Sequence, residues 1–537
     1  MRVITSKSKN SESFYINFSY VNAKGKNTSK VYKKLGTLKD LSKKLDTDRD
    51  GVMAWAKEQA RIETEKYNKE QETISIPYSP SQLIDMDKDR LFNCGYLFLR
   101  SIMSNLRFDN ICRNIKNRHD YTFNLEAILS DLVYSLILSP FSKRSTYEYA
   151  HTLIEKPKYD IQHVYRALSV IAQESDYIQS EVYKNSNFVH NRNTKVLYYD
   201  CTNYFFEIVE NAGLKQYGKS KENRANPIIG MGLFMDCDGI PLAFDLYARN
   251  RNEQTTLKPL EQKIIRDFEC SEFVYCSDSG LASQDNKLFN NFGGRSYVIT
   301  QSLKKLKKED REIALNTKQY RKVGSNEFID LKDLDENDNE VFNSIYYKEI
   351  PLSGKKVNET LIVTYSIKHK KYQAKVRQKQ IDSLKNDDVV IELIQDAMYD
   401  GFYGVTTNID NDINTIATIN KRRWEIDEYF QIMKIDFEAG SVYLQREDKI
   451  KAHFLTCFLS LLVCRLLESK LEYKYTIDEI LKTLRNMKLC VMEGYGYIPT
   501  YKRTVLTDAL HNLVDYRTDT QIIKKTKMRD IIRQSNK

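Results

Sequence analysis

A succession of strand-like segments near the middle of the chain constrains its fold more than any other feature. Short runs rich in Val, Ile, Phe and Tyr, bounded by turn residues, are typical of β-strands. Four such runs lie at residues 196–204, 228–234, 241–247 and 273–276, and a helical pattern at 257–268 separates the last two. Three sequential strands, a helix and a further strand predict an α/β domain.

The chain is too long for one hydrophobic core, because cores rarely grow beyond about 300 residues. Apolar residues alternate with polar ones from Phe14 to Tyr20, which predicts a strand, and apolar helical patterns recur between residues 38 and 186, for example at 125–138. A polar, Lys-rich stretch with short alternating strands, such as 341–347 and 360–365, follows the central domain. The region around these strands is predicted to be an insertion, after which residues 403–408 return as a core strand.

These patterns predict six modules. They are a small β module that can contact DNA (1–45), a helical DNA-binding and dimerisation region (46–190), the first part of the α/β domain (191–300), a β-rich insertion (301–400), the second part of the α/β domain (401–475) and a helical basic C-terminal region (476–537).

Positive charge is unevenly distributed along the chain. The formal net charge is +10, and basic residues cluster at 24–26, 30–34, 304–308, 368–379 and 524–533. A basic surface indicates a polyanionic partner such as DNA, because phosphates bound by Lys and Arg release counterions. Solvated helix faces account for such runs equally well, so charge alone does not decide the partner.

The cysteines and the apolar segments indicate a cytoplasmic protein. The nine cysteines are dispersed and include no Cys-x-x-Cys pair, which argues against a structural zinc site and fits a reducing compartment. Residues 1–7 lack the apolar stretch of a signal peptide. The apolar segment 454–467 is interrupted by Arg465 and is shorter than the roughly 20 residues that span a bilayer, so it predicts a buried core helix.

Three carboxylates indicate the chemistry. Asp200 follows the apolar residues 196–199 of the first strand-like run, Asp278 follows the fourth run, and a third acid lies in the helical segment 420–434. Arg423, Asp427 and Lys434 in that segment form one stripe of a regular helix. Two strand-borne acids and one helix-borne acid can form a two-metal site, which acts on phosphodiesters by in-line displacement.

The same residues resemble the DDE transposases of bacterial insertion sequences, in the branch with the Tyr-x2-Arg-x3-Glu-x6-Lys signature. The first motif of that family stands here as Asp200-Cys201-Thr202-Asn203-Tyr204-Phe205, the second as Asp278-Ser279-Gly280-Leu281-Ala282-Ser283, and the third runs from Arg423-Trp424-Glu425-Ile426-Asp427 to Lys434. The resemblance covers residues 200–434 in the family's order. It implies a ribonuclease-H-like catalytic domain with a β insertion, in which the first and fourth strands are neighbours.

Two positions depart from the signature. Asn420 stands where the family usually has Tyr, and Asp427 stands where it usually has Glu. Asp is one methylene shorter, so a metal must lie closer to the helix backbone or be bound through water. Glu428 is the rival ligand, but in a regular helix it lies about 100° around from Asp427 and off the stripe of Arg423 and Lys434. We therefore favour Asp427 as the third ligand.

The resemblance implies a set of roles for these residues. Asp200, Asp278 and Asp427 would hold two Mg²⁺ ions, for which Mn²⁺ can substitute, and would carry the catalysis. The residues implied near DNA are Asn420, Arg423, Trp424, Lys434, Arg446 and His453. Trp424 is also compatible with helix packing alone, and His453 with a cap or a core position.

The implied activity is metal-dependent cleavage at the ends of an insertion sequence, followed by transfer of the freed 3′-hydroxyl into target DNA. The implied partners are double-stranded DNA, comprising terminal inverted repeats and a target, and a second copy of the chain in a synaptic complex. The implied location is the bacterial cytoplasm, at the nucleoid. Two alternatives remain open: a transposase-derived DNA-binding protein that does not cut, and a nuclease of ribonuclease-H type.

Overall fold

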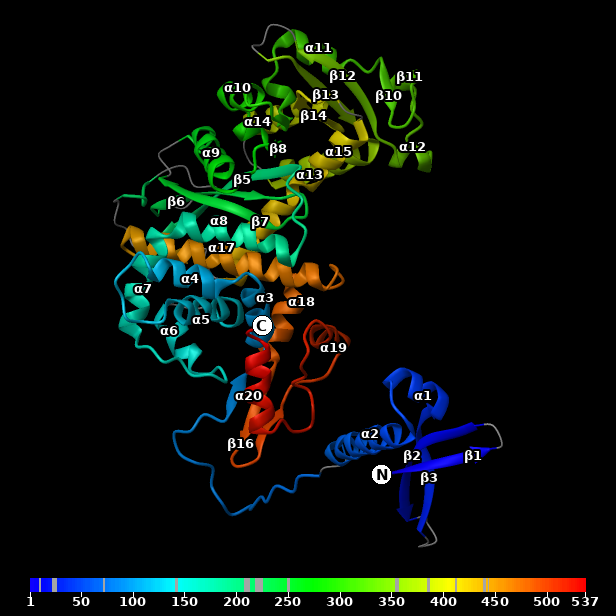
Figure 1. Ribbon diagram of the computed structural model, residues 1–537. Helices are drawn as coiled ribbons and strands as arrows, with labels where there is room; N and C mark the ends of the chain where they lie inside the picture. Colours follow the sequence, from blue (N-terminus) through cyan, green and yellow to red (C-terminus); the bar gives the residue numbers. More distant parts are fainter. Residues whose placement is uncertain are drawn as a thin grey trace. The chain divides into compact units, whose positions relative to one another are not determined.

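The structure is a computed structural model. It describes residues 1–8, 11–21, 27–70, 73–140, 143–206, 213–217, 226–248, 252–352, 357–383, 387–410, 413–437, 441–442 and 444–537. These residues form two compact units, one of residues 1–86 and one of residues 87–537 (Figure 1). Residues 73–90, which join the units, contain no helix or strand.

The N-terminal unit is a three-stranded antiparallel sheet with two helices. Its elements are β1 (Arg2–Ser8), β2 (Ser11–Val21), β3 (Asn27–Thr37), α1 (Leu38–Leu45) and α2 (Arg49–Glu70), with strand order β1-β2-β3. Phe14 of β2 packs with Leu41 of α1 and with Val52 and Ala56 of α2. Because α2 supplies half of this small core, the unit extends beyond the boundary expected at residue 45.

The second unit is built on one long mixed sheet. Its strands are β5 (Val196–Phe206), β6 (Ile228–Met235), β7 (Pro241–Ala248), β8 (Val274–Ser277), β9 (Ser296–Gln301), β10 (Tyr320–Lys322), β11 (Phe328–Ile329), β12 (Tyr346–Leu352), β13 (Glu359–Tyr365), β14 (Phe402–Thr407) and β15 (Ser441–Val442). The order is β11-β10-β12-β13-β14-β9-β8-β5-β6-β7, and β15 pairs with β5. The predicted α/β class is confirmed.

The first and fourth strands of the predicted domain, β5 and β8, are parallel neighbours, so this expectation is also confirmed. β6 and β7 follow β5 in antiparallel pairs, and β9 lies parallel to β8 on the other side. The core of the sheet, β7-β6-β5-β8-β9, thus has consecutive strands in the order 3-2-1-4-5.

The insertion does not form a separate sheet. β14 pairs antiparallel with β9 on one side and with β13 on the other, so β10 to β13 continue the central sheet. The insertion also contains helices, namely α11 (Lys308–Leu315), α12 (Asn339–Asn343), α13 (Ile367–Ser383) and α14 (Asp387–Gln395). The strand expected at 341–347 is wrong: Asp338 caps α12 by accepting hydrogen bonds from the amides of Glu340 and Val341, and β12 begins only at Tyr346.

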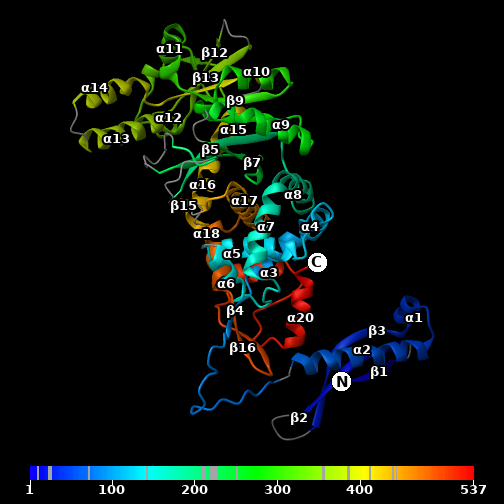
Figure 2. The same ribbon diagram turned by 90° about the vertical axis from the view of Figure 1, so that its left-hand side faces the viewer.

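Helices cover both faces of β5 to β9 (Figures 1 and 2). α9 (Leu257–Asp267) and α10 (Gln284–Phe292) lie against one face. The other face packs on α8 (Ser175–Val189), α15 (Ile413–Lys421), α16 (Glu425–Gln431) and α17 (Glu447–Lys470). Alternation along β5 explains the two cores, because Leu197 and Tyr199 face α9 whereas Val196 and Tyr198 face α17.

The remaining helices form a layer in which α17 contacts the first, third, fifth and sixth of those named next. They are α3 (Tyr96–Asn105), α4 (Phe108–Lys116), α5 (Leu125–Leu138), α6 (Lys143–Ala150), α7 (Ile161–Gln173), α18 (Ile477–Asn486), α19 (Val505–Asn512) and α20 (Lys525–Gln534), with a small sheet of β4 (Leu91–Asn93), β16 (Lys488–Met492) and β17 (Gly496–Pro499). The helix expected at 125–138 is confirmed as α5. The part of the expected region 46–190 that follows residue 86 shares this layer with the region expected at 476–537, since β4 pairs with β16.

α17 is the buried core helix expected at 454–467. It is long and apolar enough to cross a membrane, yet 94% of its most apolar window is buried inside the protein. Arg465, which interrupts its apolar sequence, donates from Nε to the carbonyl of Gly239 at 3.0 Å and pairs with Glu468. A buried cation is tolerated here because its donors are satisfied.

Candidate active site

Asp200 and Asp278 lie at the same height on adjacent parallel strands. β5 and β8 pair Val196 with Val274 and Tyr198 with Cys276. Extended by two residues, to Asp200 within β5 and to Asp278 directly after β8, this register places the two acids opposite each other. Paired strands are about 4.8 Å apart, so the two carboxylates are neighbours.

Both acids lie on the face of the sheet that packs on α15 to α17. Tyr198 and Cys276, two residues before them, belong to the core on that face. Asp200 is 6% exposed, and its Oδ1 accepts a hydrogen bond from the amide of Cys201. Asp278 is half-buried, and its Oδ1 accepts from the amide of Gly280 at 2.8 Å.

The helical segment with the third motif crosses this face. α15 continues through a 3-10 turn (Arg422–Trp424) into α16 and a π-helical turn (Ile432–Asp436). Ile426 and Met433 of this segment are fully buried against the sheet. Departures from regular α geometry frequently mark functional sites in helices.

Arg423 lies beside the two strand-borne acids. Burial acts most strongly on its guanidinium and by itself would lower its pKa. The charges of Tyr403, Asp278 and Asp200 outweigh burial, so the pKa of Arg423 lies above its usual value. Among the described residues, its Nε is buried and has no hydrogen-bond partner. A half-buried guanidinium with an unused donor beside two acids is suited to binding an anionic group.

Asp427 and Glu428 lie on different sides of α16, and both are exposed. Glu428 lies on the side of α17, where its charge contributes to raising the pKa of Tyr429 and of Glu468, behind burial as the main cause. Asp427 follows Arg423 by about one helical turn and therefore shares the side of the two strand-borne acids.

The acids fit a magnesium site only in part. Among the described residues, no group of three His, Cys, Asp or Glu side chains is close enough to hold a metal ion. Asp200 and Asp278 nevertheless form a carboxylate pair, and Mg²⁺ is typically bound by one or two carboxylates together with substrate phosphates. The pair therefore fits the ion, while the exposed Asp427 does not complete a cluster.

Asn420 contacts a tyrosine that the sequence did not predict for this site. The hydroxyl of Tyr403 in β14 donates to Oδ1 of Asn420 at 3.5 Å and is 2.7 Å from Oγ1 of Thr300 in β9. Tyr403 also acts on the charge of Arg423. A phenol is thus present beside Asn420, at the position where the signature has lost its own. The strand containing Tyr403 was predicted, but its pairing with β9 was not.

Lys434 and His453 lie near Tyr204, a residue that follows Asp200 along β5. The Nζ of Lys434 is 5.7 Å from the centre of the Tyr204 ring. The half-buried His453 neighbours Phe454, whose ring packs edge-on against Tyr204. The π-helical turn changes the regular spacing from which Lys434 was placed, yet Lys434 remains on the face of β5 that bears Asp200.

The two other residues expected near DNA are Arg446 and Trp424. Arg446 begins α17 and forms an exposed ion pair with Asp448, with Nη2 and Oδ2 2.9 Å apart. The backbone of Trp424 lies in the 3-10 turn, and its side chain is outside the described residues. Neither residue is brought to Asp200 or Asp278 by a described contact.

Comparison with protein-family models gives no match for this chain, and comparison with curated protein sequences gives none either. The functional conclusion therefore depends on the motifs of the chain and on the geometry described above.

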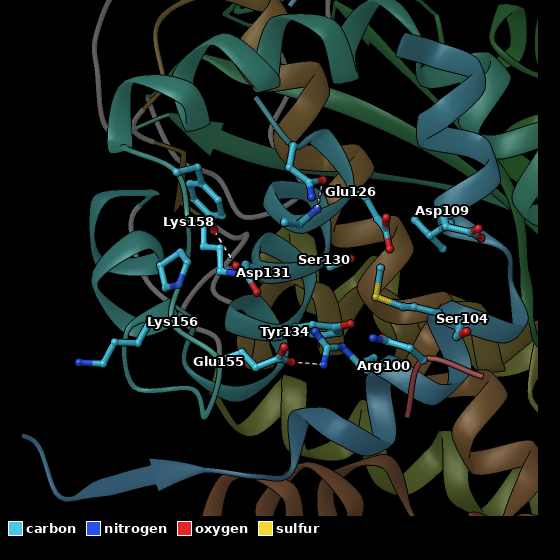
Figure 3. A pocket seen from close by; sticks show the side chains of 17 residues that line it. Arg100, Ser104, Asp109, Glu126, Ser130, Asp131, Tyr134, Glu155, Lys156 and Lys158 are labelled. Atoms are coloured by element: carbon cyan, nitrogen blue, oxygen red, sulfur yellow. Dashed lines mark hydrogen bonds and ion pairs between the residues drawn. The ribbon is translucent and has the colours of Figure 1, made fainter. Parts of the chain in front are cut away.

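A separate pocket lies in the helical layer, among α3, α5 and the loop before α7. Its volume is about 470 Å³, and Arg100, Glu126, Asp131, Glu155 and Tyr159 are among the residues that line it (Figure 3). Figure 3 shows Arg100 paired with Glu155 at one wall. Burial raises the pKa of Asp131 to about 6, although the hydroxyl of Tyr159 donates to its Oδ2 at 2.7 Å and opposes this.

Replacement of Asp131 by Asn is expected to stabilise the protein at neutral pH. Because the folded-state pKa is raised, Asp131 favours folding when protonated, and this contribution is lost as the pH rises from about 4 to about 6. The variant removes a cost of roughly 1–3 kcal/mol at pH 7.5 and changes little at pH 4. Urea unfolding at the two pH values measures the difference. Asp109→Asn, on the exposed rim of the same pocket, is the control and should be neutral at both.

Proposed function

We propose that the protein is a DDE-type transposase, which cleaves the ends of a mobile DNA element and joins the freed 3′-hydroxyl to target DNA. The observation that carries the proposal is the shared register of Asp200 and Asp278 on β5 and β8, with Arg423 beside both. A carboxylate pair next to a half-buried cation is suited to a phosphodiester substrate.

The strand arrangement supports the same proposal. The order 3-2-1-4-5 with a parallel fourth and fifth strand is that of a ribonuclease-H-like sheet, which the resemblance to transposases implies. Asp200 lies within the first strand, Asp278 directly follows the fourth, and the third motif lies on a helix that crosses the same face.

Each residue has a role that follows from its charge and position. Asp200 and Asp278 would hold divalent ions, and bound Mg²⁺ would supply charge stabilisation for in-line attack on phosphorus. Arg423 would bind non-bridging phosphate oxygens with its planar guanidinium. Lys434, over Tyr204, would bind a phosphate further along the DNA strand as a point charge.

The test is a cleavage assay with the DNA that flanks the coding region. The flanking duplex is labelled at one strand end and incubated with the full chain, with Mg²⁺, with Mn²⁺ or with a chelator. We expect a nick at one position in either metal and none with the chelator. Binding without cleavage in both metals would instead favour the transposase-derived DNA-binding protein. That alternative is favoured by the exposed position of Asp427.

A change of substrate distinguishes a nuclease of ribonuclease-H type from the proposed transposase. Such an enzyme would cut an RNA–DNA hybrid of the same sequence, and it would not join a 3′-hydroxyl to a second duplex. Including the hybrid and an unlabelled target duplex in the assay therefore distinguishes the two enzymes.

The variant Arg423→Lys is expected to reduce the single-turnover cleavage rate roughly tenfold to a hundredfold, because Lys cannot replace a bidentate guanidinium. Arg422→Lys is the matched control. Arg422 pairs with Glu425 at 3.1 Å and donates to the Sγ of Cys237, and neither partner is one of the two acids, so its variant should cleave like the wild type. Equal loss in both variants would show that the helix, and not Arg423, is responsible.

A further inference from the structure

We propose that the open face of the N-terminal sheet is the surface by which this protein binds the major groove of DNA. The face is defined by its polar members Arg2, Ser13, Tyr15, Ser19, Ser29 and Lys34. The inference rests on the proposed function for its biological setting, but the surface itself is argued from the N-terminal unit alone.

The helices cover only one face of this sheet. Phe14 and Ile16 are fully buried on the helix side, and the ring of Phe18 is 4.7 Å from that of Tyr67 in α2. Lys33, which pairs across the sheet with Ile16, binds Glu63 of α2 at 2.5 Å. Side chains alternate along a strand, so the residues between these ones in β2 point to the opposite face.

Cross-strand pairing identifies the members of the opposite face, because directly paired residues share a face. Tyr15 pairs with Lys34, and the Lys34 Nζ lies 6.0 Å from the centre of the Tyr15 ring. Ser19 pairs with Ser29, and Ser13 pairs with Ser6. Arg2 is exposed, and its partner in β2 is Asn17.

The charge of this face is entirely positive in the part of the strands that the structure describes. Glu12 is the one acid within the described ranges of β1, β2 and β3, and it binds Arg49 of α2 through both oxygens, at 2.8 and 3.0 Å. Arg2 and Lys34 therefore have no acid beside them on the open face. Such a surface complements a polyanion and would repel a basic protein partner.

The dimensions and the chemistry fit duplex DNA. Three strands measure about 10 Å across, and the major groove is about 12 Å wide and admits β-ribbons. Serine hydroxyls can donate to or accept from base edges, while Arg and Lys bind phosphates or guanine. The apolar members Ile4 and Val31 are too few for a protein-binding patch.

The segment that joins the N-terminal unit to the second unit allows the sheet to bind DNA separately. Residues 73–90 contain no helix or strand, and an extended chain spans about 3.3 Å per residue. A sheet attached through such a segment can bind one part of a DNA end while the acids of the second unit act on another.

The test measures binding of the full chain to a labelled mixed-sequence DNA duplex over a range of salt concentrations. The double variant Arg2→Ala, Lys34→Ala is expected to lower the slope of log affinity against log salt by about 2, since each lost phosphate contact removes about 0.9. At 0.1 M salt, binding should weaken roughly tenfold to a hundredfold.

The control is the double variant Lys43→Ala, Lys57→Ala, which removes the same charge from exposed positions on α1 and α2. It should keep the wild-type slope. The inference is overturned if the open-face variant binds like the wild type, if both variants lose the same slope, or if the open-face variant changes the oligomeric mass and not the DNA affinity. Circular dichroism of both variants verifies that the sheet has folded.

The outcomes separate this inference from the proposed function. If the wild type cleaves DNA and the open-face variant binds normally, the transposase proposal stands and this inference fails. If the wild type binds through this face but never cleaves in Mg²⁺ or Mn²⁺, this inference stands and the transposase proposal fails.

Discussion

Replacing Asp200 or Asp278 with asparagine is expected to reduce metal-dependent DNA cleavage by at least about a thousandfold, since a bound metal contributes several kcal/mol to a phosphoryl-transfer transition state. Asparagine retains the size of the side chain. Its amide oxygen can still accept from the amides of Cys201 and Gly280, so the local backbone should keep its structure. What is lost is the negative charge that attracts a divalent ion.

The measurement is the single-turnover cleavage rate at saturating DNA and Mg²⁺, together with DNA affinity in a chelator. Affinity should stay within a few-fold of the wild type, because the chelator removes the metal from all samples. Asp285→Asn is the matched control: it removes one carboxylate charge from an exposed position in α10, on the opposite face of the sheet. Undiminished cleavage in both site variants would contradict the assignment of the active site.

The second large effect concerns the third acid. Asp427→Ala is expected to lose about a hundredfold or more in cleavage rate, whereas Glu428→Ala should stay within a few-fold of the wild type. The reason is the direction of the two side chains, because Asp427 shares the side of Arg423 and the charge of Glu428 acts on Glu468 and Tyr429.

A third variant tests further whether Asp427 or Glu428 is the third ligand. Asp427→Glu adds one methylene, which extends the carboxylate from its exposed position towards Asp200 and Asp278, so its cleavage rate should equal or exceed that of the wild type. If Glu428→Ala lost activity and Asp427→Ala did not, Glu428 would be the third ligand. Equal, small effects of both would favour a chain that has lost its cutting activity.

Much of the secondary structure could be predicted because it depends on local chemistry. The helix at 125–138 begins after Asn124, whose Oδ1 accepts from the amide of Ala127 at 3.0 Å, and both the cap and the apolar pattern are visible in the sequence. The strand expected at 360–365 is present as β13. The strand predicted at 341–347 was wrong for an equally local reason, because capping by Asp338 outweighed the alternation of apolar residues.

Long-range pairing could not be predicted in the same way. The sequence indicated that the strand around Tyr403 belongs to the core, but not that it lies beside β9 or that it joins the insertion to the central sheet. The contribution of α2 to the N-terminal core, which moves the boundary from residue 45 to residue 86, also depends on contacts between distant residues.

The candidate site also contains residues that the sequence predicted and residues that it did not. Asp200, Asp278 and the helix of Arg423 were identified from motifs, because an acid directly after an apolar run leaves a short recognisable pattern. Tyr403 and Thr300 were not, because their contact with Asn420 exists only through the pairing of β14 with β9. The π-helical turn before Phe437 also escaped a prediction that assumed regular helical spacing.

By itself, the amino-acid sequence determined many of the strands and helices and which acids follow apolar runs, since propensity, capping and alternation act over a few residues. The tertiary structure decided that two of those acids share one register, that Arg423 lies beside them, and that the charge of Glu428 acts on the side of α17. These facts depend on which strands pair and on which face each helix buries, and both are set by the packing of segments that are far apart along the chain.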